Sequence, residues 1–198
     1  MPREKGQKGK ESRSRLLNAA AEEFAVNGFH ETKVSSIVAA AGMTQPAFYL
    51  YFQSKEAVFE QLVGEFRSGV RQLLTDIRME SGLEKREIPE RAVAAVEAVF
   101  RYMGENASLT RIGLILAPEA ESIKREFITW LAENLLVEQQ AGYFRSDLEM
   151  DFVAECLYGM IERLAFTQLI PGIQTPQTLA RQMACFILPG MAVKEDVR

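Results

Sequence analysis

A short run at residues 44–51, TQPAFYLY, brings together side chains whose chemistry suits a DNA groove. The amide of Gln45 can bond in a bidentate manner to the edge of adenine, and Pro46 and Ala47 can contact thymine methyl groups. Hydroxyl and ammonium groups of the kind that bind phosphate lie in and beside the run. The sequence therefore predicts a set of DNA-binding residues: Lys33, Thr44, Gln45, Pro46, Ala47, Tyr49, Tyr51 and Lys55.

Two predicted helices and a tight turn would hold this run in place. Apolar residues at helical spacing predict a first helix over 34–41. Gly42 would end it, because glycine reaches the left-handed C-terminal conformation without strain. Thr44 is a suitable N-cap, and Pro46 suits the first turn of a second helix over 45–51.

The second predicted helix is short and polar at its start, unlike a core helix. Its Phe48, and Phe52 four residues later, would pack inward and hold the helix against its domain. The other face would be free to enter a major groove, as the recognition helix of a helix-turn-helix over 33–52. The alternative is a plain helical hairpin in an all-α core, since short turns containing glycine are common between helices.

Further residues around the motif form a specific pattern: Gly28-Phe29, Ile37, Ala41-Gly42-Met43-Thr44, Phe48-Tyr49, Tyr51-Phe52 and Ser54-Lys55-Glu56. On these residues, within about 13–60, the chain resembles the N-terminal domain of the TetR family of transcriptional repressors. Departures from the usual family residues occur at Lys33, Val38, Met43 and Thr44, and they are small. The resemblance implies a repressor that binds a palindromic double-stranded DNA operator as a homodimer and is released by a small-molecule effector.

Composition argues against other classes of protein. No apolar run approaches the roughly 20 residues that span a bilayer, and no signal peptide opens the chain, so we expect a cytoplasmic protein with no membrane partner. With one histidine, His30, and no P-loop, nucleotide fingerprint or metal-ligand spacing, we expect neither an enzyme nor a cofactor or metal. An enzyme, or a ligand-binding helical bundle without DNA binding, is the alternative function.

The two cysteines, Cys156 and Cys185, fall on apolar faces of separate predicted helices. In a reducing cytosol this favours buried free thiols over a disulfide or a metal site.

The net charge of −4 is unevenly divided along the chain. Residues 1–55 carry a formal charge of +3 and residues 56–198 carry −7. A positive N-terminal part matches DNA binding, and an acidic remainder would be repelled by DNA, which helps to fix orientation. Residues 1–10 are rich in lysine and glycine, and we expect a flexible basic tail that either stays solvated or contacts phosphates. The residues available for such contacts are Arg3, Lys5, Lys8 and Lys10.

Helical periodicity continues to the C-terminus without an alternating strand pattern, which predicts an all-α fold of about nine helices. Residues 11–56 would form the helix-turn-helix domain, and residues 57–198 a C-terminal domain for effector binding and dimerisation. A long helix over 55–79 would join the two domains. The remaining helices are expected at about 12–27, 89–106, 108–116, 118–140, 150–169 and from 176 to the Pro189-Gly190 pair.

Large apolar side chains on the middle helices of the C-terminal domain are each most simply explained as core. Together they could line an apolar cavity between helices, and the resemblance favours an effector site there. We expect an effector that is apolar and uncharged, or amphipathic. The predicted lining is Phe66, Phe100, Met103, Ile112, Leu116, Phe127 and Trp130.

The last two predicted helices are apolar on more than one side, which is typical of an interface. Two such helices from each of two chains would form a four-helix dimer core. A monomer in which these helices wrap around the others is the alternative. The predicted interface residues are Leu157, Met160, Leu164, Leu179, Met183 and Phe186.

Overall fold

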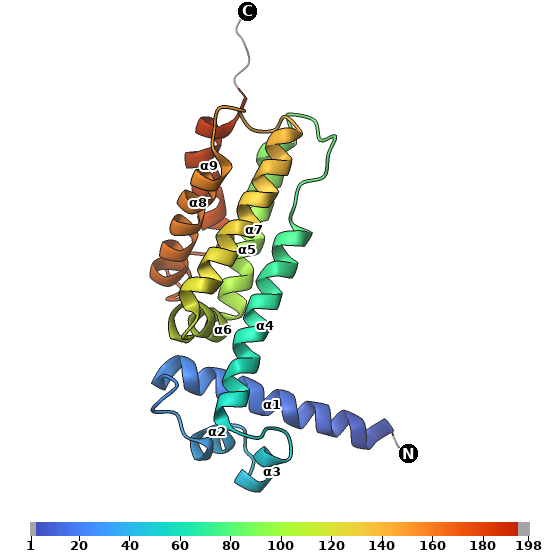
Figure 1. The fold of residues 1–198 in the computed structure, drawn as a ribbon, viewed down its shortest axis with the longest axis vertical. Helices are drawn as coiled ribbons and strands as arrows, with labels where there is room; N and C mark the ends of the chain where they lie inside the picture. Colours follow the sequence, from blue (N-terminus) through green and yellow to red (C-terminus); the bar gives the residue numbers. More distant parts are fainter. Residues whose placement is uncertain (1–2, 194–198) are drawn as a thin grey trace, which may run out of the picture. The chain divides into compact units, whose positions relative to one another are not determined.

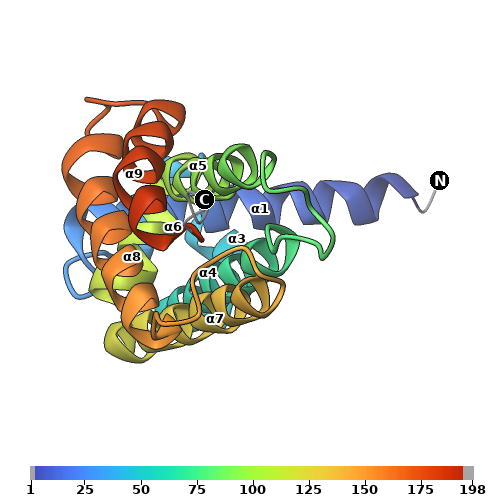
Figure 2. The same cartoon turned by 90° about the horizontal axis from the view of Figure 1, so that it is seen from above.

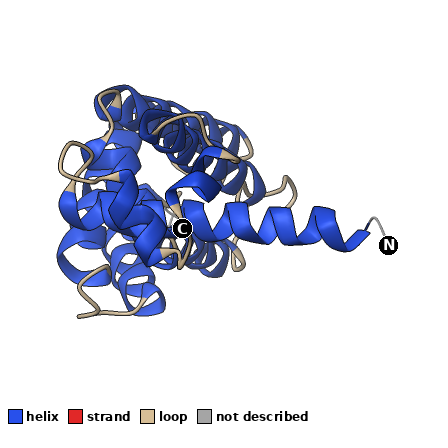
Figure 3. Ribbon diagram, turned by 90° about the horizontal axis from the view of Figure 1, so that it is seen from below, coloured by secondary structure: helices blue, strands red, loops and turns tan. Residues whose placement is uncertain are grey.

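The computed structural model describes residues 3–193, with side chains described from Lys8 onward. Every regular element in this range is a helix (Figure 3), apart from an isolated antiparallel bridge between Phe144 and Ala192. The predicted all-α fold class is therefore confirmed. The α-helices (Figure 1) are α1 Arg3–Asn27, α2 Val34–Ala40, α3 Gln45–Tyr49, α4 Lys55–Asp76, α5 Ile88–Glu105, α6 Ala107–Arg111, α7 Ala120–Gln140, α8 Met150–Leu164 and α9 Pro176–Met191, and the π-helical segments are η1 Ile112–Leu116 and η2 Ala165–Leu169.

The chain divides into two compact units. Unit 1 comprises Met1–Ser68 and Ser108–Ala120, and unit 2 comprises Gly69–Ala107 and Glu121–Arg198. Unit 1 is larger than the DNA-binding domain expected over 11–56, because the first part of α4 belongs to it and η1 packs against α1. Helix α4 contributes residues to both units.

Unit 1 is built on an aromatic core. The Phe24 side chain is fully buried, and its ring centroid lies 5.2 Å from that of Phe59 and 5.7 Å from that of Phe29. Gly28, at φ +79°, ends α1, and its N–H donates to the Phe24 carbonyl at 2.8 Å. The predicted glycine stop, with Phe29 folded back on Phe24, is present.

Helix α1 begins nine residues earlier than its predicted start at Ser12. The tail predicted over 1–10 is thus part of α1 at residues 3–10, while Met1 and Pro2 lie outside the described residues. Arginine, glutamate, lysine and glutamine are good helix formers, and extending an existing helix avoids the cost of nucleation. The side chains of Lys8 and Lys10 are exposed on this first part of α1.

The predicted helix over 108–116 is divided into α6 and the π-helical η1. A Cβ atom at Gly113 would lie 2.1 Å from the Phe66 ring, so only glycine allows this packing. Phe66 and Ile112 are both fully buried within unit 1. The last five residues of the helix predicted over 150–169 likewise form the π-helical η2.

Unit 2 is a helical bundle in which α5 packs along α9 (Figure 2). A Cβ atom at Gly69 would lie 2.1 Å from the Tyr102 hydroxyl, so the α4 glycine permits close packing against α5. Buried residues from α5, α7, α8, α9 and their connections form one cluster: Met79, Ile88, Ala132, Leu135, Tyr143, Phe144, Met150, Ala154 and Met191.

The connection between α7 and α8 holds two other parts of unit 2. The buried Tyr143 hydroxyl donates to the Glu80 carbonyl at 2.7 Å and accepts from the Leu83 N–H at 2.9 Å. The Arg145 N–H donates to the Met191 carbonyl at 2.9 Å. One short connection therefore fixes both the α4–α5 linker and the end of α9.

Two predicted helix ends are wrong. Helix α4 stops at Asp76 rather than near residue 79. Helix α9 continues through Pro189 to Met191, although the Pro189-Gly190 pair was expected to end it. Proline in a last turn removes few hydrogen bonds, and the buried Met191 side chain favours the extra turn. Within residues 3–193, no helix combines the length and apolarity that crossing a bilayer requires.

Candidate nucleic-acid interface and ligand cavity

The turn between α2 and α3 is fixed by its backbone. Gly42 has φ +62°, its N–H donates to the Ala39 carbonyl at 3.1 Å, and the Met43 N–H donates to the Val38 carbonyl at 2.7 Å. This pair of bonds is a Schellman motif, which satisfies the last carbonyls of α2. The predicted glycine turn is therefore present, and it sets the direction in which α3 leaves α2.

Two arginines of α1 contact the helix-turn-helix and the residues that follow it. The Arg15 guanidinium donates to the Ala41 carbonyl, at the C-terminal end of α2, where a positive charge is favourable. The Arg13 guanidinium lies 4.9 Å from the centroid of the Phe52 ring and donates to Gln61. The sequence analysis missed both residues, because their spacing along α1 gives no sign of these distant partners.

Helix α3 has one buried and one exposed face. Phe48 is fully buried, and its ring centroid lies 5.6 Å from that of Phe52, as predicted. Gln45 and Pro46 are exposed, and the exposed fraction of Tyr49 is 58%. Leu50 is 80% exposed, and this candidate contact was missed because leucine reads as core. The exposed face of α3 is therefore free to meet a partner.

The other predicted contacts flank this face. Thr44 precedes α3 in an extended conformation, but its side chain makes no capping hydrogen bond. Lys33 precedes α2 in the same way and is exposed. Ala47 and Tyr51 are half-buried.

Lys55, predicted as a phosphate contact, bonds within unit 1. Its Nζ donates to the carbonyls of Phe29 at 2.7 Å, Thr32 at 2.9 Å and His30 at 3.4 Å, and it lies 4.4 Å from the centroid of the Phe29 ring. An ammonium group has three N–H donors, so these carbonyls can use all of them. Lys55 therefore holds the α1–α2 connection to the start of α4.

The residues of the predicted effector pocket are divided between the two units. Phe66, Ile112 and Leu116 belong to unit 1, whereas Phe100, Met103, Phe127 and Trp130 belong to unit 2. Phe100, Met103 and Phe127 are at most 1% exposed, which makes them core residues of unit 2. Trp130 is half-buried, and the Arg71 guanidinium lies 5.7 Å from its ring centroid. Apolar type and helical spacing do not distinguish a filled core from a cavity wall.

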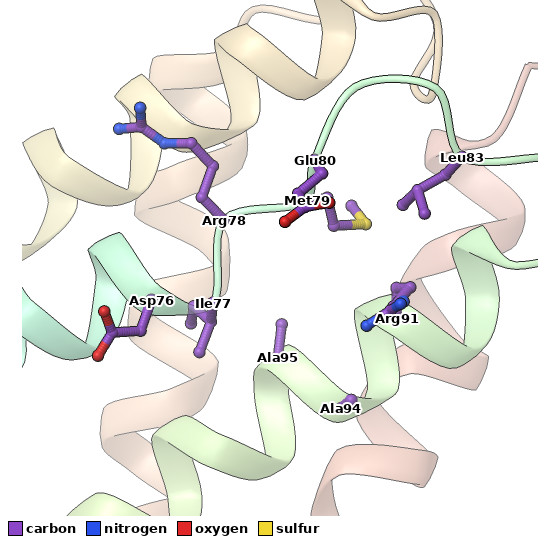
Figure 4. Close-up of a pocket in the computed structure, with 9 residues that line it drawn as sticks. All are labelled: Asp76, Ile77, Arg78, Met79, Glu80, Leu83, Arg91, Ala94 and Ala95. Atoms are coloured by element: carbon purple, nitrogen blue, oxygen red, sulfur yellow. The ribbon is translucent and has the colours of Figure 1, made fainter.

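Unit 2 contains a cavity in another place. An outer cavity of about 260 Å³ lies where the end of α4 and the following linker face α5 (Figure 4). A second cavity of about 90 Å³, here called the inner cavity, is lined by α5, α7, α8, α9 and the segment after α4. Ile77, Met79 and Ala95 line both cavities. Together they fall at the lower end of the roughly 300–1,000 Å³ typical of ligand sites.

The inner cavity has a polar wall on α7. The Asn134 Nδ2 donates to the Leu74 carbonyl at 2.6 Å, and its Oδ1 accepts from the Arg78 Nε at 2.7 Å. The Glu138 Oε1 accepts from the Met79 N–H at 3.0 Å. Burial raises the pKa of Glu138 to about 7, against the lowering effects of the Met79 hydrogen bond and the Arg78 charge. This wall was not predicted, because its only signal in the sequence is the spacing of two polar residues four apart on α7.

The predicted interface residues have mixed positions. Leu179 and Met183 are at most 4% exposed, and Met183 and Leu157 line the inner cavity, so these three face the interior of unit 2. Met160 and Leu164 are half-buried. Phe186 is 78% exposed, which is the position that an interface residue requires.

The outer face of α8 and α9 carries other apolar side chains. Phe152 is 68% exposed, and the free thiols of Cys156 and Cys185 are exposed rather than buried as predicted. Both helices are apolar on two faces, and in the structure the face opposite to these residues is the buried one. The outer face is defined here by Phe152, Cys156, Cys185 and Phe186.

These features define a helix-turn-helix transcriptional regulator with a separate helical unit, and comparisons with known proteins agree. The model for bacterial regulatory proteins of the tetR family matches residues 16–62. An uncharacterized HTH-type transcriptional regulator, YdgC of Bacillus subtilis, is 50% identical over 192 residues, covering 96% of this chain and 98% of that protein. The chain therefore belongs to the tetR family of bacterial regulatory proteins.

More distant relatives extend the comparison. The HTH-type transcriptional repressor KstR2 of Rhodococcus jostii is 26% identical over 191 residues, 91% of each chain. The structure of the ketosteroid transcriptional regulator KstR2 of Mycobacterium tuberculosis shares the fold, with a TM-score of 0.72 at 23% identity, covering 92% of this chain and 95% of that one. These relatives are transcriptional regulators and not enzymes.

Proposed function

We propose that the protein is a repressor that binds a palindromic DNA operator as a homodimer and is released by a small molecule. The observation that carries this proposal is the exposed face of α3, held outward by the buried Phe48 and Phe52. In this proposal Gln45 reads a base edge in the major groove, and Tyr49 and Lys33 contact phosphates. Repression is supported by the related repressor KstR2.

The outer face of α8 and α9 supports the dimer. Two phenylalanines more than half exposed on adjacent helices are unusual for a surface that meets only water. A two-fold axis through this face would pair it with the same face of a second chain, forming four helices. Such a dimer would present two α3 helices to two half-sites, which requires a palindromic operator.

The cavity of unit 2 supports regulation by a small molecule. Its inner part is lined by apolar side chains and by Asn134 and Glu138, so it suits an apolar or amphipathic molecule. Asn134 also bonds to the Leu74 carbonyl near the end of α4, and α4 begins directly after the helix-turn-helix. A molecule that disturbed this end of α4 would act on the element that follows the DNA-reading motif.

Binding of one operator by the wild type and by two variants tests the DNA-binding proposal. The operator is first identified among the genomic DNA fragments that the protein retains. The Gln45→Ala variant should then lose about 1–3 kcal/mol of binding free energy at one base position and tolerate other bases there. Gln177→Ala, which changes an exposed glutamine of α9, is the control and should bind like the wild type. Equal losses on all sequences would show that Gln45 does not read a base.

A reporter gene placed behind that operator tests the direction of regulation. Deleting the regulator should raise expression if it is a repressor, and a fall in expression would show that it is an activator.

Sedimentation tests the dimer. A Phe186→Asp variant places a charge on the outer face and should weaken self-association roughly 30-fold or more, since buried aromatic anchors contribute about 2 kcal/mol or more. Leu136→Asp, at a 46% exposed position of α7, is the control and should leave the dimer intact. A wild-type protein that sediments as a monomer at micromolar concentration would end this part of the proposal.

A further inference from the structure

The wall of the inner cavity is polar at one place only. Asn134 and Glu138 are four residues apart on α7, so they share one face of the helix. Their exposed fractions are 5% and 6%, and every other residue that lines the inner cavity is apolar. A molecule in this cavity either leaves the polar pair unused or binds to it.

The two polar side chains differ in how many of their polar atoms are already hydrogen-bonded. Both ends of the Asn134 amide are used, by the Leu74 carbonyl and by Arg78. Glu138 accepts one hydrogen bond, from the Met79 N–H, through Oε1. Its Oε2 has no hydrogen-bond partner, and Glu138 has no ion pair, among the residues that the structure describes. Of the four side-chain N and O atoms of this pair, Glu138 Oε2 is therefore the one without a hydrogen bond among the described residues.

We infer that Glu138 is the polar anchor of the effector site, and that the effector is an apolar molecule carrying a cationic amine. This inference rests on the proposed function, in which the cavity of unit 2 receives a small molecule. The ammonium group would donate to Glu138 Oε2, and the apolar part would occupy the space between α5, α7, α8 and α9.

Charge explains why a cation suits this wall. A carboxylate in an apolar wall is unfavourable without a counter-ion, and burial accordingly raises the pKa of Glu138 to about 7. Arg78, whose charge acts on Glu138, bonds to Asn134 and extends away from Ala95 and Arg91 (Figure 4). A ligand ammonium supplies a positive charge in addition to that of Arg78, whereas a ligand carboxylate would place two acids together. The outer cavity balances Asp76 and Glu80 against Arg78 and Arg91, so it does not exclude a cation.

The anchor also lies at the end of α4. Glu138 accepts the Met79 N–H three residues after α4 stops, so an ammonium bound at Oε2 shares this carboxylate with that hydrogen bond. Binding of the amine therefore acts on the segment that follows α4.

Calorimetric binding of three probes that differ only in the polar group tests the inference. Octylamine, octanol and octanoate are titrated into the full-length protein at pH 8, where Glu138 is mostly ionised. Octylamine should bind roughly 10-fold more tightly than octanol, since a charged hydrogen bond contributes about 1.5–3 kcal/mol. Glu138→Gln keeps an acceptor for the Met79 N–H and should remove this preference while octanol binding stays the same. Glu133→Gln, at an exposed position of α7, is the control and should keep the preference.

A second measurement needs no variant. For the wild type, lowering the pH through about 7 protonates Glu138 and should weaken octylamine binding but not octanol binding. The inference is overturned if octanoate binds most tightly, if Glu138→Gln keeps the amine preference, or if none of the three probes binds. Operator binding is measured on the same samples. If the protein binds the operator but shows no preference for octylamine, only the role of Glu138 as anchor is rejected and the proposed DNA-binding function stands.

Discussion

The helix-turn-helix and the cavity of unit 2 arrange polar and apolar groups in opposite ways. In the helix-turn-helix the apolar side chains fill the inside, Phe48 is fully buried, and the polar side chains of α3 face outward. In unit 2 two polar side chains face inward, and the space beside them is not filled by the protein.

Under the proposed function, the difference follows from what each site would do. A surface that reads DNA has to be held rigidly before contact, because base readout depends on precise hydrogen-bond positions. A cavity that takes a ligand keeps unfilled volume and an uncompensated acid, which lower the stability of the free protein. The first site is therefore expected to be sensitive to lost packing, and the second to pH.

The largest expected effect is on the packing of α3. Phe48→Ala should lower the free energy of unfolding by about 3–5 kcal/mol, because a fully buried phenylalanine is replaced by a cavity. Tyr49→Ala, at the neighbouring and 58% exposed position, should change it by less than about 0.5 kcal/mol. Urea unfolding measures both, and similar losses would show that α3 is not held by its buried face.

The next effect concerns the buried acid. The unfolded chain releases the Glu138 proton near pH 4.5, and the folded protein keeps it up to about pH 7. The stability from this group is therefore fully present below pH 4.5 and is lost as the pH rises to about 7, by about 3 kcal/mol. Relative to the wild type, Glu138→Gln should gain stability over this interval. Urea unfolding at several pH values checks the sign, and parallel curves for the two proteins would contradict it.

The smallest effect is on the turn. Gly42→Ala should cost about 1–2 kcal/mol, because alanine at φ +62° is strained and its Cβ would lie 3.1 Å from the Arg15 guanidinium. Gly64→Ala, inside α4 with open space around it, should instead stabilise the protein by up to about 1 kcal/mol. Thermal unfolding of the two variants should thus shift in opposite directions. A gain for Gly42→Ala would show that the turn is not fixed by its glycine.

The two regions also differ in how far the sequence predicts them. The helix-turn-helix depends on local signals, so Gly42, Phe48 and Phe52 could be assigned from their spacing. The role of Lys55 could not, because its partners lie 23 to 26 residues away. In unit 2 the helices were predictable, but the cavity was not.

The reason is that a helix apolar on two faces does not show which face the bundle buries. Met183 and Phe186 are three residues apart on α9, yet one lines the inner cavity and the other is exposed. The same ambiguity placed Cys185 inside, whereas it is exposed. Only the packing of α9 against α5 decides these positions.

The hydrogen bonds of the Tyr143 hydroxyl are expected to slow amide hydrogen exchange in the α4–α5 linker. A polar loop usually exchanges its amide hydrogens with solvent within seconds or faster, because it opens freely. The Leu83 N–H is instead bonded to a buried hydroxyl that is also bonded to the Glu80 carbonyl. Its exchange with deuterium therefore follows the opening of the α7–α8 connection, and this single loop amide records how often unit 2 loosens around its cavity.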